Sequence, residues 1–451
     1  MDGARPRALR LAHGPGAHRP NIAPLDLKWS NATGWSLSAG RRGRSSGLPR
    51  GYTLPVSITR RPTEAFLSER VRAIQPSGIR RFFDMLAEMR DVISLTIGEP
   101  DFTTPEPITR AAIDSLEHGQ THYTANGGIV ELRELIAQNL RDRYSVAYDP
   151  FHELIITVGA SEAVDASLRA ILDPGDEVIY HEPCFVAYAP CIELAGGVPV
   201  RIATGDDHDF EVSAEQIEAA ITPRTKAIFL GYPNNPTGAV LDREELAAIA
   251  AVAERHDLLV LTDEIYDRLV YGGHQHVAFS ALDGMRDRTV LIGGFSKAYA
   301  MTGWRIGYVA APAGLMTGIA KVHQYGIMCA PTPAQFAAME AIRTGEPFVQ
   351  GMLEEYDRRR LLMTGRLNEM GLHCFEPRGA FYCFPNVTDA TGLDEETFAQ
   401  RLLAEERVAV VPGVAFGPSG AGHVRMCYAT AYEEIVEAMD RMERFVARCR
   451  A

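Results

Sequence analysis

Short apolar runs alternate with helical stretches from Thr63 onward, and this alternation limits the possible folds more than any other feature of the chain. Five runs read as buried strands: 153–158, 176–180, 227–230, 258–261 and 289–292. Helical spacing of apolar residues occurs between them, as after Asp242, where Glu245 completes a capping box. The pattern predicts an α/β fold with a mainly parallel sheet and helices on both faces.

Two further stretches depart from this alternation. The apolar run 306–310 follows the fifth strand too closely for a crossover helix, so we expect it to run antiparallel. From about residue 340 the chain changes to long charged helices around short strands, which predicts a second, smaller α+β domain. The helices are expected at 346–368, 395–406 and 432–448, and the strands near 380–384, 408–411 and 424–428.

The first 62 residues differ in composition from the rest. They hold ten Arg and one Lys against Asp2 and Asp26, a net charge of +9, so the remainder carries −22 of the total of −13. They are rich in Gly, Pro, Ser and Arg and lack sustained periodicity, which predicts a disordered extension or an over-long start. The acidic body argues against nucleic acid as the main partner, although the basic segment leaves open a tether to nucleic acid or to an anionic surface.

The cysteines and the apolar runs indicate a cellular setting. The seven cysteines are odd in number and no two are spaced as C-x-x-C. This pattern favours reduced thiols in a cytoplasmic enzyme over a disulfide framework or a zinc site. The chain has no apolar run long enough to span a membrane and no apolar core of a secretory signal near its start. We therefore expect a cytoplasmic protein with no membrane span and no metal.

Polar residues gather where the predicted strands end, the edge at which open α/β sheets bind ligands. The strand 227–230 leads to Asn235, 258–261 to Asp263 and Tyr266, 289–292 to Ser296 and Lys297, and 153–158 to Ala160 and Ser161 at a helix start. One edge would then present an amide, a carboxylate, a phenol, an amine and a helix N-terminus. This set suits a phosphorylated aromatic cofactor with a carbonyl group.

The segment 294–307, Gly-Phe-Ser-Lys-Ala-Tyr-Ala-Met-Thr-Gly-Trp-Arg-Ile-Gly, resembles the pyridoxal 5′-phosphate (PLP) attachment signature of the class I/II aminotransferases. The segments 97–102, 233–238, 263–266 and 423–425 match the same family in order, and the likeness covers about residues 63–451. Each motif is moderately specific, but the ordered set is highly specific.

The resemblance implies fold type I, with a mostly parallel seven-stranded sheet in a large PLP-binding domain at 106–339. A smaller α+β domain would occupy 340–451. Residues 63–105 would form an N-terminal arm and part of the small domain.

The resemblance also implies a catalytic group of three residues, Lys297, Asp263 and Tyr266, together with Asn235 as a cofactor contact. Lys297 would hold PLP as a Schiff base, since an amine condenses reversibly with an aldehyde and partial burial lowers its pKa. Asp263 would face the pyridine nitrogen and keep the ring protonated. Tyr266 and Asn235 would hydrogen-bond the phenolic oxygen. A surface lysine, a helix cap and a turn asparagine are the ordinary alternatives for these positions.

The remaining cofactor contacts follow from the same resemblance. Four positions are expected to hold the phosphate: Ala160, Ser161, Ser296 and Arg305. Gly294 stands where the family often has serine, so one phosphate contact is expected to be missing. Phe185 resembles the aromatic residue that stacks on the ring. Tyr123 resembles the tyrosine that reaches the phosphate of the partner subunit, which implies a homodimer. A core phenylalanine and a loop tyrosine are the alternatives.

Substrate binding is expected to centre on Arg425, whose guanidinium matches an α-carboxylate with two parallel hydrogen bonds. The amide of Asn235 and the backbone at Gly98 would assist. The implied reaction moves an amino group from an L-amino acid to a 2-oxo acid, with 2-oxoglutarate as the expected acceptor, by a ping-pong mechanism. Ser161 replaces a lysine of aspartate-specific relatives, which disfavours aspartate. The segment 323–332 resembles relatives acting on aromatic amino acids or N-acyl-diaminopimelate.

Three other functions are alternatives to an aminotransferase. A carbon–sulfur β-lyase on the same fold would share the lysine, the aspartate and the arginine. A transcription regulator with an aminotransferase-like domain would need an N-terminal DNA-binding module, and residues 1–62 show no pattern for one. A binding protein without activity is disfavoured because Lys297, Asp263 and Arg425 are all present.

Overall fold

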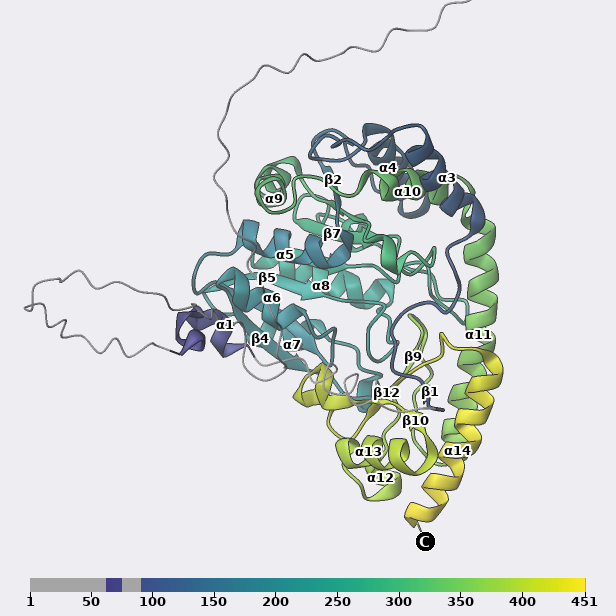
Figure 1. Cartoon of the computed structure of the whole chain (residues 1–451). Coiled ribbons are helices and arrows are strands. Elements are labelled where there is room, and N and C mark those ends of the chain that lie inside the picture. The colour runs from purple at the N-terminus through teal and green to yellow at the C-terminus, as the bar shows by residue number, and fades with distance from the viewer. Residues whose placement is uncertain (1–61, 75–90, 451) are drawn as a thin grey trace, which may run out of the picture. The chain divides into compact units, whose positions relative to one another are not determined.

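The computed structural model describes residues 62–74 and 91–450, and Thr63 to Ala451 group into one compact unit (Figure 1). The extension expected at 1–62 lies outside the described residues except for Pro62. The division of the body at 105 and 339 stays a prediction.

The centre of the molecule is a seven-stranded sheet in the order β2-β8-β7-β6-β5-β3-β4. Its strands are β2 (Leu154–Thr157), β3 (Glu177–Glu182), β4 (Val198–Ala203), β5 (Thr225–Leu230), β6 (Leu259–Asp263), β7 (Thr289–Gly294) and β8 (Gly307–Ala310). Strand β8 is antiparallel to both β2 and β7, and the pairs among β3 to β7 are parallel. The mostly parallel sheet and its reversed strand at 306–310 are confirmed.

Helices cover both faces of this sheet (Figure 1). One face packs against α5 (Gly159–Ile171), α6 (Tyr188–Ala195) and α9 (Ala313–Gly326). The other packs against α3 (Glu106–Glu117), α4 (Val130–Tyr144), α7 (Ala214–Ala220), α8 (Arg243–Arg255) and α10 (Thr332–Thr344). Successive strand residues point to opposite faces, so Leu261 packs with α5 and Val260 with α8. The strands are therefore apolar almost throughout.

A second group of elements follows residue 345. Strands β9 (Tyr382–Cys383), β11 (Val411–Pro412) and β12 (Val424–Cys427) form an antiparallel sheet, and β10 (Val408–Ala409) pairs in parallel with β1 (Ile93–Ser94). Helices α11 (Glu346–Glu369), α12 (Thr388–Thr391), α13 (Glu395–Glu406) and α14 (Tyr432–Arg450) surround them. They share one apolar core with Leu95, so the α+β character expected here is confirmed.

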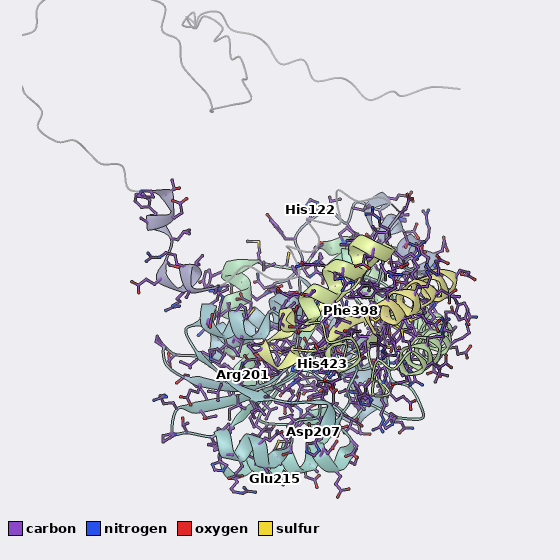
Figure 2. All side chains as sticks on the ribbon, turned by 90° about the horizontal axis from the view of Figure 1, so that it is seen from below. His122, Arg201, Asp207, Glu215, Phe398 and His423 are labelled. Atoms are coloured by element: carbon purple, nitrogen blue, oxygen red, sulfur yellow. The ribbon has the colours of Figure 1, made fainter. Side chains whose placement is uncertain are left out.

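Short elements complete the described chain. Helix α1 spans Glu69–Ala73, and 3-10 turns lie at Thr63–Phe66, Asp206–His208, Phe279–Ala281, Thr302–Trp304, Gly413–Phe416 and Pro418–Gly420. Figure 2 views the molecule from below, with Glu215 of α7 at its margin and His423 in its interior. His423 is buried and pairs with Asp206 at 2.8 Å.

Three further features concern the thiols, the helices and the potential metal ligands. All seven thiols are free. Within the described ranges, each helix is too short or too polar to traverse a lipid bilayer. No group of His, Cys, Asp and Glu in that part of the chain is arranged to hold a metal ion.

Candidate active site

A cavity of about 380 Å³ opens at the carboxyl edge of the seven-stranded sheet. It brings together every residue predicted for the site except Tyr123: Gly98, Ala160, Ser161, Phe185, Asn235, Asp263, Tyr266, Ser296, Lys297, Arg305 and Arg425. The strands β2, β5, β6 and β7 end at this edge, and β12 and the segment after β1 supply the residues that face them. Residues more than 300 positions apart in the sequence thus line one space.

Lys297 follows β7 and points into the cavity because its neighbours are anchored elsewhere. Phe295 and Ala298 pack into the core on the α4 and α10 side. The Nζ atom donates a hydrogen bond to the carbonyl oxygen of Gly98 at 2.6 Å. Burial lowers the pKa of Lys297 to about 8. The amine is therefore available in its unprotonated, nucleophilic form near neutral pH.

Asp263 is the last residue of β6 and is 7% exposed. Burial raises the pKa of Asp263 to about 6, although the Tyr188 hydroxyl and the Ile265 amide stabilise the charged form. The hydroxyl donates to Oδ2 at 2.9 Å and the amide to Oδ1 at 3.2 Å. Such a buried carboxylate favours a cationic partner in the cavity.

Groups that favour an anion gather where β2 turns into α5. Gly159 makes this turn with a φ of +74°, and a Cβ there would lie 2.8 Å from Nη2 of Arg305. The guanidinium of Arg305 thus lies against the start of α5, and its Nη1 donates to the carbonyl of Thr302 at 2.9 Å. Free N–H groups of the first turn and the helix dipole favour an anion here.

Arg425 lies on β12 and is 4% exposed. Its Nη2 donates to the carbonyl of Thr96 at 2.6 Å and its Nη1 to Oδ1 of Asn235 at 2.9 Å. Its Nε is buried and has no hydrogen-bond partner among the described residues. A buried guanidinium with an unused donor can bind a carboxylate by donating a hydrogen bond to it.

The comparisons with known proteins agree with this geometry. Residues 90–442 match the family model for aminotransferase class I and II. The chain belongs to this family. It is 52% identical over 382 residues to the putative aminotransferase YugH of Bacillus subtilis strain 168. The aligned residues cover 85% of this chain and 98% of that protein. It is 46% identical over 380 residues to an aspartate aminotransferase of Pyrococcus abyssi, covering 84% and 97%.

A solved structure extends the likeness to three dimensions. The aromatic aminotransferase of Pyrococcus horikoshii OT3 superposes with a TM-score of 0.78 at 45% identity, covering 81% of this chain and 99% of that one. The fold is therefore that of the fold type I aminotransferases, and the enzyme is a transaminase.

Two tyrosines of the aminotransferase site were missed by the sequence analysis. Tyr188 donates to Asp263, and the Tyr382 hydroxyl lies 2.8 Å from that of Tyr266. A Cβ at Gly98 would lie 2.4 Å from the Tyr382 hydroxyl, so the glycine permits this close approach. The paired residues are 75 and 116 positions apart in the sequence. A local sequence pattern therefore cannot predict these contacts.

Gly294 has a packing explanation in this aminotransferase. A Cβ at that position would lie 2.9 Å from Cδ1 of Ile265 and 3.3 Å from Cα of Gly307. A serine would therefore force its neighbours to move. Gly294 does not line the cavity, which leaves the hydroxyl of Ser296 as the predicted contact beside Lys297.

Tyr123 lies apart from the other predicted site residues. Its side chain is 81% exposed and does not line the cavity of its own chain. Several side-chain hydrogen bonds hold the loop that carries it, among them those of Asn126 and Gln335. Asn126 donates to the carbonyl of Met328 at 2.7 Å, and Gln335 donates to the hydroxyl of Thr124 at 3.1 Å.

Proposed function

We propose that this aminotransferase binds PLP on Lys297 and moves an amino group from an L-amino acid to a 2-oxo acid, with 2-oxoglutarate as the acceptor. One observation carries the proposal: a single cavity is lined by Lys297, by Asp263 with its buried carboxylate and by Arg425, whose buried Nε has no hydrogen-bond partner among the described residues. Each of these three groups would serve a different part of the transamination reaction.

The residues present fit the cofactor. The start of α5 and Arg305 offer donors and positive charge for a phosphate, together with the hydroxyls of Ser161 and Ser296. Asp263 offers a buried carboxylate for a protonated ring nitrogen. Phe185 lines the same cavity and can cover an aromatic ring. When bound, PLP supplies an aldehyde for the amino group and a ring that withdraws electrons from the substrate α-carbon.

Lys297 is proposed to move the proton. Its pKa of about 8 lets the amine take a proton from the substrate α-carbon near neutral pH and deliver it to the cofactor carbon that receives the amino group. Tyr266 is buried and shares a hydrogen bond with Tyr382. With Asn235, whose Oδ1 is engaged by Arg425, it can donate to a phenolic oxygen in the cavity.

Arg425 is proposed to bind the α-carboxylate of both substrates. Both the amino acid and the 2-oxo acid carry this group, so one guanidinium serves both half-reactions, as a ping-pong mechanism requires. The backbone at Gly98 and the amide of Asn235 border the same space. The substrate carboxylate would accept a hydrogen bond from Nε of Arg425, which has no other partner among the described residues.

The experiment that tests the proposal is the half-reaction. PLP-loaded enzyme is given an amino donor without an acceptor, and the 2-oxo acid and the cofactor absorbance are measured. We expect at most one equivalent of 2-oxo acid per site and recovery of the spectrum on addition of 2-oxoglutarate. Continuous release of ammonia would instead establish a lyase. Lys297→Ala should show neither turnover nor the Schiff-base absorption, and normal transamination by that variant would refute the assignment.

The donor is proposed to be an aromatic amino acid or an N-acyl-diaminopimelate. Ser161 stands at the start of α5 in place of the lysine that would pair with a distal carboxylate. A panel of L-phenylalanine, L-tyrosine, N-acyl-LL-diaminopimelate and L-aspartate, each with 2-oxoglutarate, ranks these donors by kcat/KM. A preference for aspartate would overturn this part of the proposal.

Assembly and location complete the proposal. We infer a cytoplasmic homodimer in which Tyr123, exposed in its own chain, reaches the phosphate of the other subunit. Sedimentation equilibrium measures the assembly. Tyr123→Phe should weaken PLP binding without changing that mass, whereas a monomeric active enzyme would contradict the role of Tyr123.

A further inference from the structure

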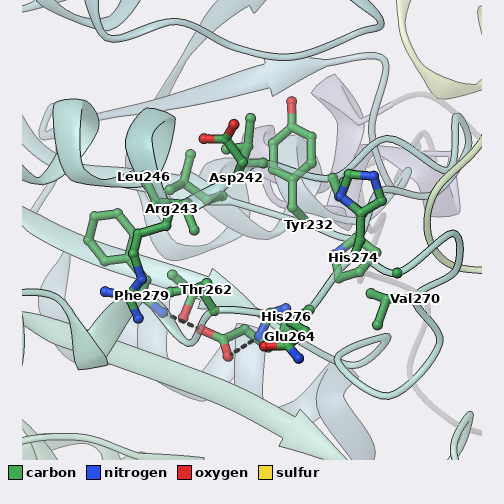
Figure 3. Close-up of a pocket in the computed structure, with 17 residues that line it drawn as sticks. Tyr232, Asp242, Arg243, Leu246, Thr262, Glu264, Val270, His274, His276 and Phe279 are labelled. Atoms are coloured by element: carbon green, nitrogen blue, oxygen red, sulfur yellow. Dashed lines mark hydrogen bonds and ion pairs between the residues drawn. The ribbon is translucent and has the colours of Figure 1, made fainter.

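A second cavity, of about 400 Å³, lies behind the catalytic strand β6 (Figure 3). Side chains alternate along a strand, so Thr262 and Glu264 line this cavity whereas Asp263, between them, lines the catalytic one. Pro233 borders both spaces. The second cavity is therefore separate from the catalytic site but directly adjoins it.

The floor of this cavity has unused hydrogen-bonding capacity. Glu264 is 5% exposed, and its carboxylate accepts from Nε2 of His276 at 2.7 Å and from the amide of Phe279 at 3.2 Å. A carboxylate offers about four lone-pair sites, so two remain. Thr262 is 3% exposed, and its hydroxyl has no partner among the described residues. The spare capacity is mainly that of an acceptor.

The charges beside the floor favour a cation. His276 itself pairs with Glu264 at 2.7 Å. Burial lowers the pKa of His276, but the carboxylates of Glu264 and Asp267 outweigh the burial and raise it, so two acidic groups face one imidazolium. The next cation along the chain, Arg268, is already paired with Glu346 at 2.7 Å. At the rim, Arg243 and Asp242, the N-cap of α8, carry opposite charges.

The walls suit a flat apolar body. Tyr232, Leu246 and Phe279 line the cavity, and the Tyr232 hydroxyl is turned away to donate to the carbonyl of Phe210 at 2.9 Å. In Figure 3, Thr262, Glu264 and His276 lie along one side, with Leu246, Asp242 and Tyr232 opposite. A polar floor thus faces an aromatic and aliphatic wall.

We propose that this cavity is a second ligand site, for a small flat molecule with an amidinium or guanidinium head. The head would donate to Glu264 and Thr262, and the apolar body would lie against Tyr232 and Phe279. Planar nitrogen cations match a carboxylate with directed hydrogen bonds. Binding here does not depend on the reaction proposed for the catalytic cavity.

The test uses benzamidine and the PLP-loaded enzyme, in which the cofactor occupies the catalytic cavity. Calorimetry should give one benzamidine per chain, and the uncharged analogue benzamide should bind about tenfold more weakly or worse, because it lacks the charge-assisted bond. Absence of benzamidine binding, or equal affinity for benzamide, would overturn the proposal.

Three variants locate the ligand. Leu246→Trp fills the cavity from its wall, and Thr262→Val removes the floor hydroxyl at nearly constant shape. Thr289→Val is the matched control, a buried strand threonine whose hydroxyl donates to Met285 and which lines neither cavity. We expect both cavity variants to weaken benzamidine about tenfold and the control to leave it unchanged. Binding that survives Thr262→Val in a folded protein would place the ligand elsewhere and refute the site.

Discussion

The chemistry of Lys297 depends on its burial, and this can be measured before any reaction is studied. Burial lowers the pKa of its amine to about 8, whereas an ordinary lysine titrates near 10.4. In cofactor-free protein, the rate of acetylation of Lys297 by trace acetic anhydride should rise with pH through a midpoint near 8, since only the neutral amine reacts. Mass spectrometry of the labelled peptides gives the rate at each pH.

The small number of lysines in the chain makes the labelled peptides easy to assign. It has four lysines in all: Lys28, Lys226, Lys297 and Lys321. Lys321 is exposed on α9 and serves as the reference in the same sample. A midpoint for Lys297 near 10.4 would show that the cavity does not disfavour the charged amine.

Tyr188 should tune Asp263 in a predictable direction. Its hydroxyl donates to the carboxylate and stabilises the charged form, so Tyr188→Phe should raise the pKa of Asp263 above about 6. Pairing with a protonated ring nitrogen needs the ionised carboxylate. PLP affinity should therefore fall as pH drops through that pKa, and the fall should begin at higher pH in the variant.

Fluorescence titration with PLP between pH 5 and 8 measures this shift. The ionisations of PLP itself are common to both proteins, so the displacement between the two curves is diagnostic. Tyr271→Phe, which removes a buried hydroxyl that donates to Ala380 outside the cavity, is the control. Superimposable curves for wild type and Tyr188→Phe would mean that the hydrogen bond does not influence Asp263.

Single residues of the site differ in how well their position in it could be predicted from the sequence. Lys297, Asp263 and Asn235 follow apolar runs that read as strands, so their gathering at one edge could be predicted. Tyr188 could not, because its partner is 75 positions away. Gly294 could be noticed as a departure from a family pattern, but its reason, the close approach of Ile265 and Gly307, exists only after folding.

At the scale of elements, a buried histidine joins α9, α5 and the loop that carries Tyr123. Nε2 of His323 lies 2.9 Å from the carbonyl of Asn126, and its Nδ1 lies 2.5 Å from Oε1 of Glu162. The other oxygen of Glu162 accepts from the amide of Val158, at the turn that begins α5. One imidazole thus fixes the start of the proposed phosphate-binding helix against the loop.

His323→Phe keeps a planar ring and removes both contacts. Leaving buried polar partners unsatisfied should lower the free energy of unfolding by about 1–3 kcal/mol, measured by urea denaturation. Hydrogen exchange should accelerate at residues 123–128 and 158–162. His208→Phe, at a side chain that is 78% exposed, is the control. Unchanged exchange in both segments would show that the histidine does not connect them.

Elements were predictable where their burial is uniform. The strands β5, β6 and β7 are buried on both faces and read as apolar runs. Strand β4 lies at the edge of the sheet, only Ile202 in it is buried, and Pro199 and Arg201 interrupt its pattern. It was missed because an edge strand carries little of the apolar signal.

At the scale of the whole molecule, the site exists only once distant parts have met. Arg425 contacts Asn235 and Thr96, which lie 190 and 329 positions away. These residues could be named from a family pattern, but two features are properties of the assembled fold: the Nε of Arg425, which has no partner among the described residues, and the second cavity behind β6.

The contribution of the basic segment, residues 1–61, to the stability of the whole molecule can also be tested. Residues 92 to 449 supply every member of the apolar core clusters in the described parts of the chain. The described contact of α1 with the body is peripheral, an exposed bond from Arg70 to the carbonyl of Leu194. The sequence of residues 1–61 lacks sustained periodicity and predicts a disordered extension, so removing them should leave the thermal midpoint and kcat/KM unchanged. Net charge would fall from −13 to −22, because the segment carries +9, so the truncated enzyme should elute later from an anion exchanger and lose any retention on heparin. A lower thermal midpoint would instead show that the segment stabilises the fold.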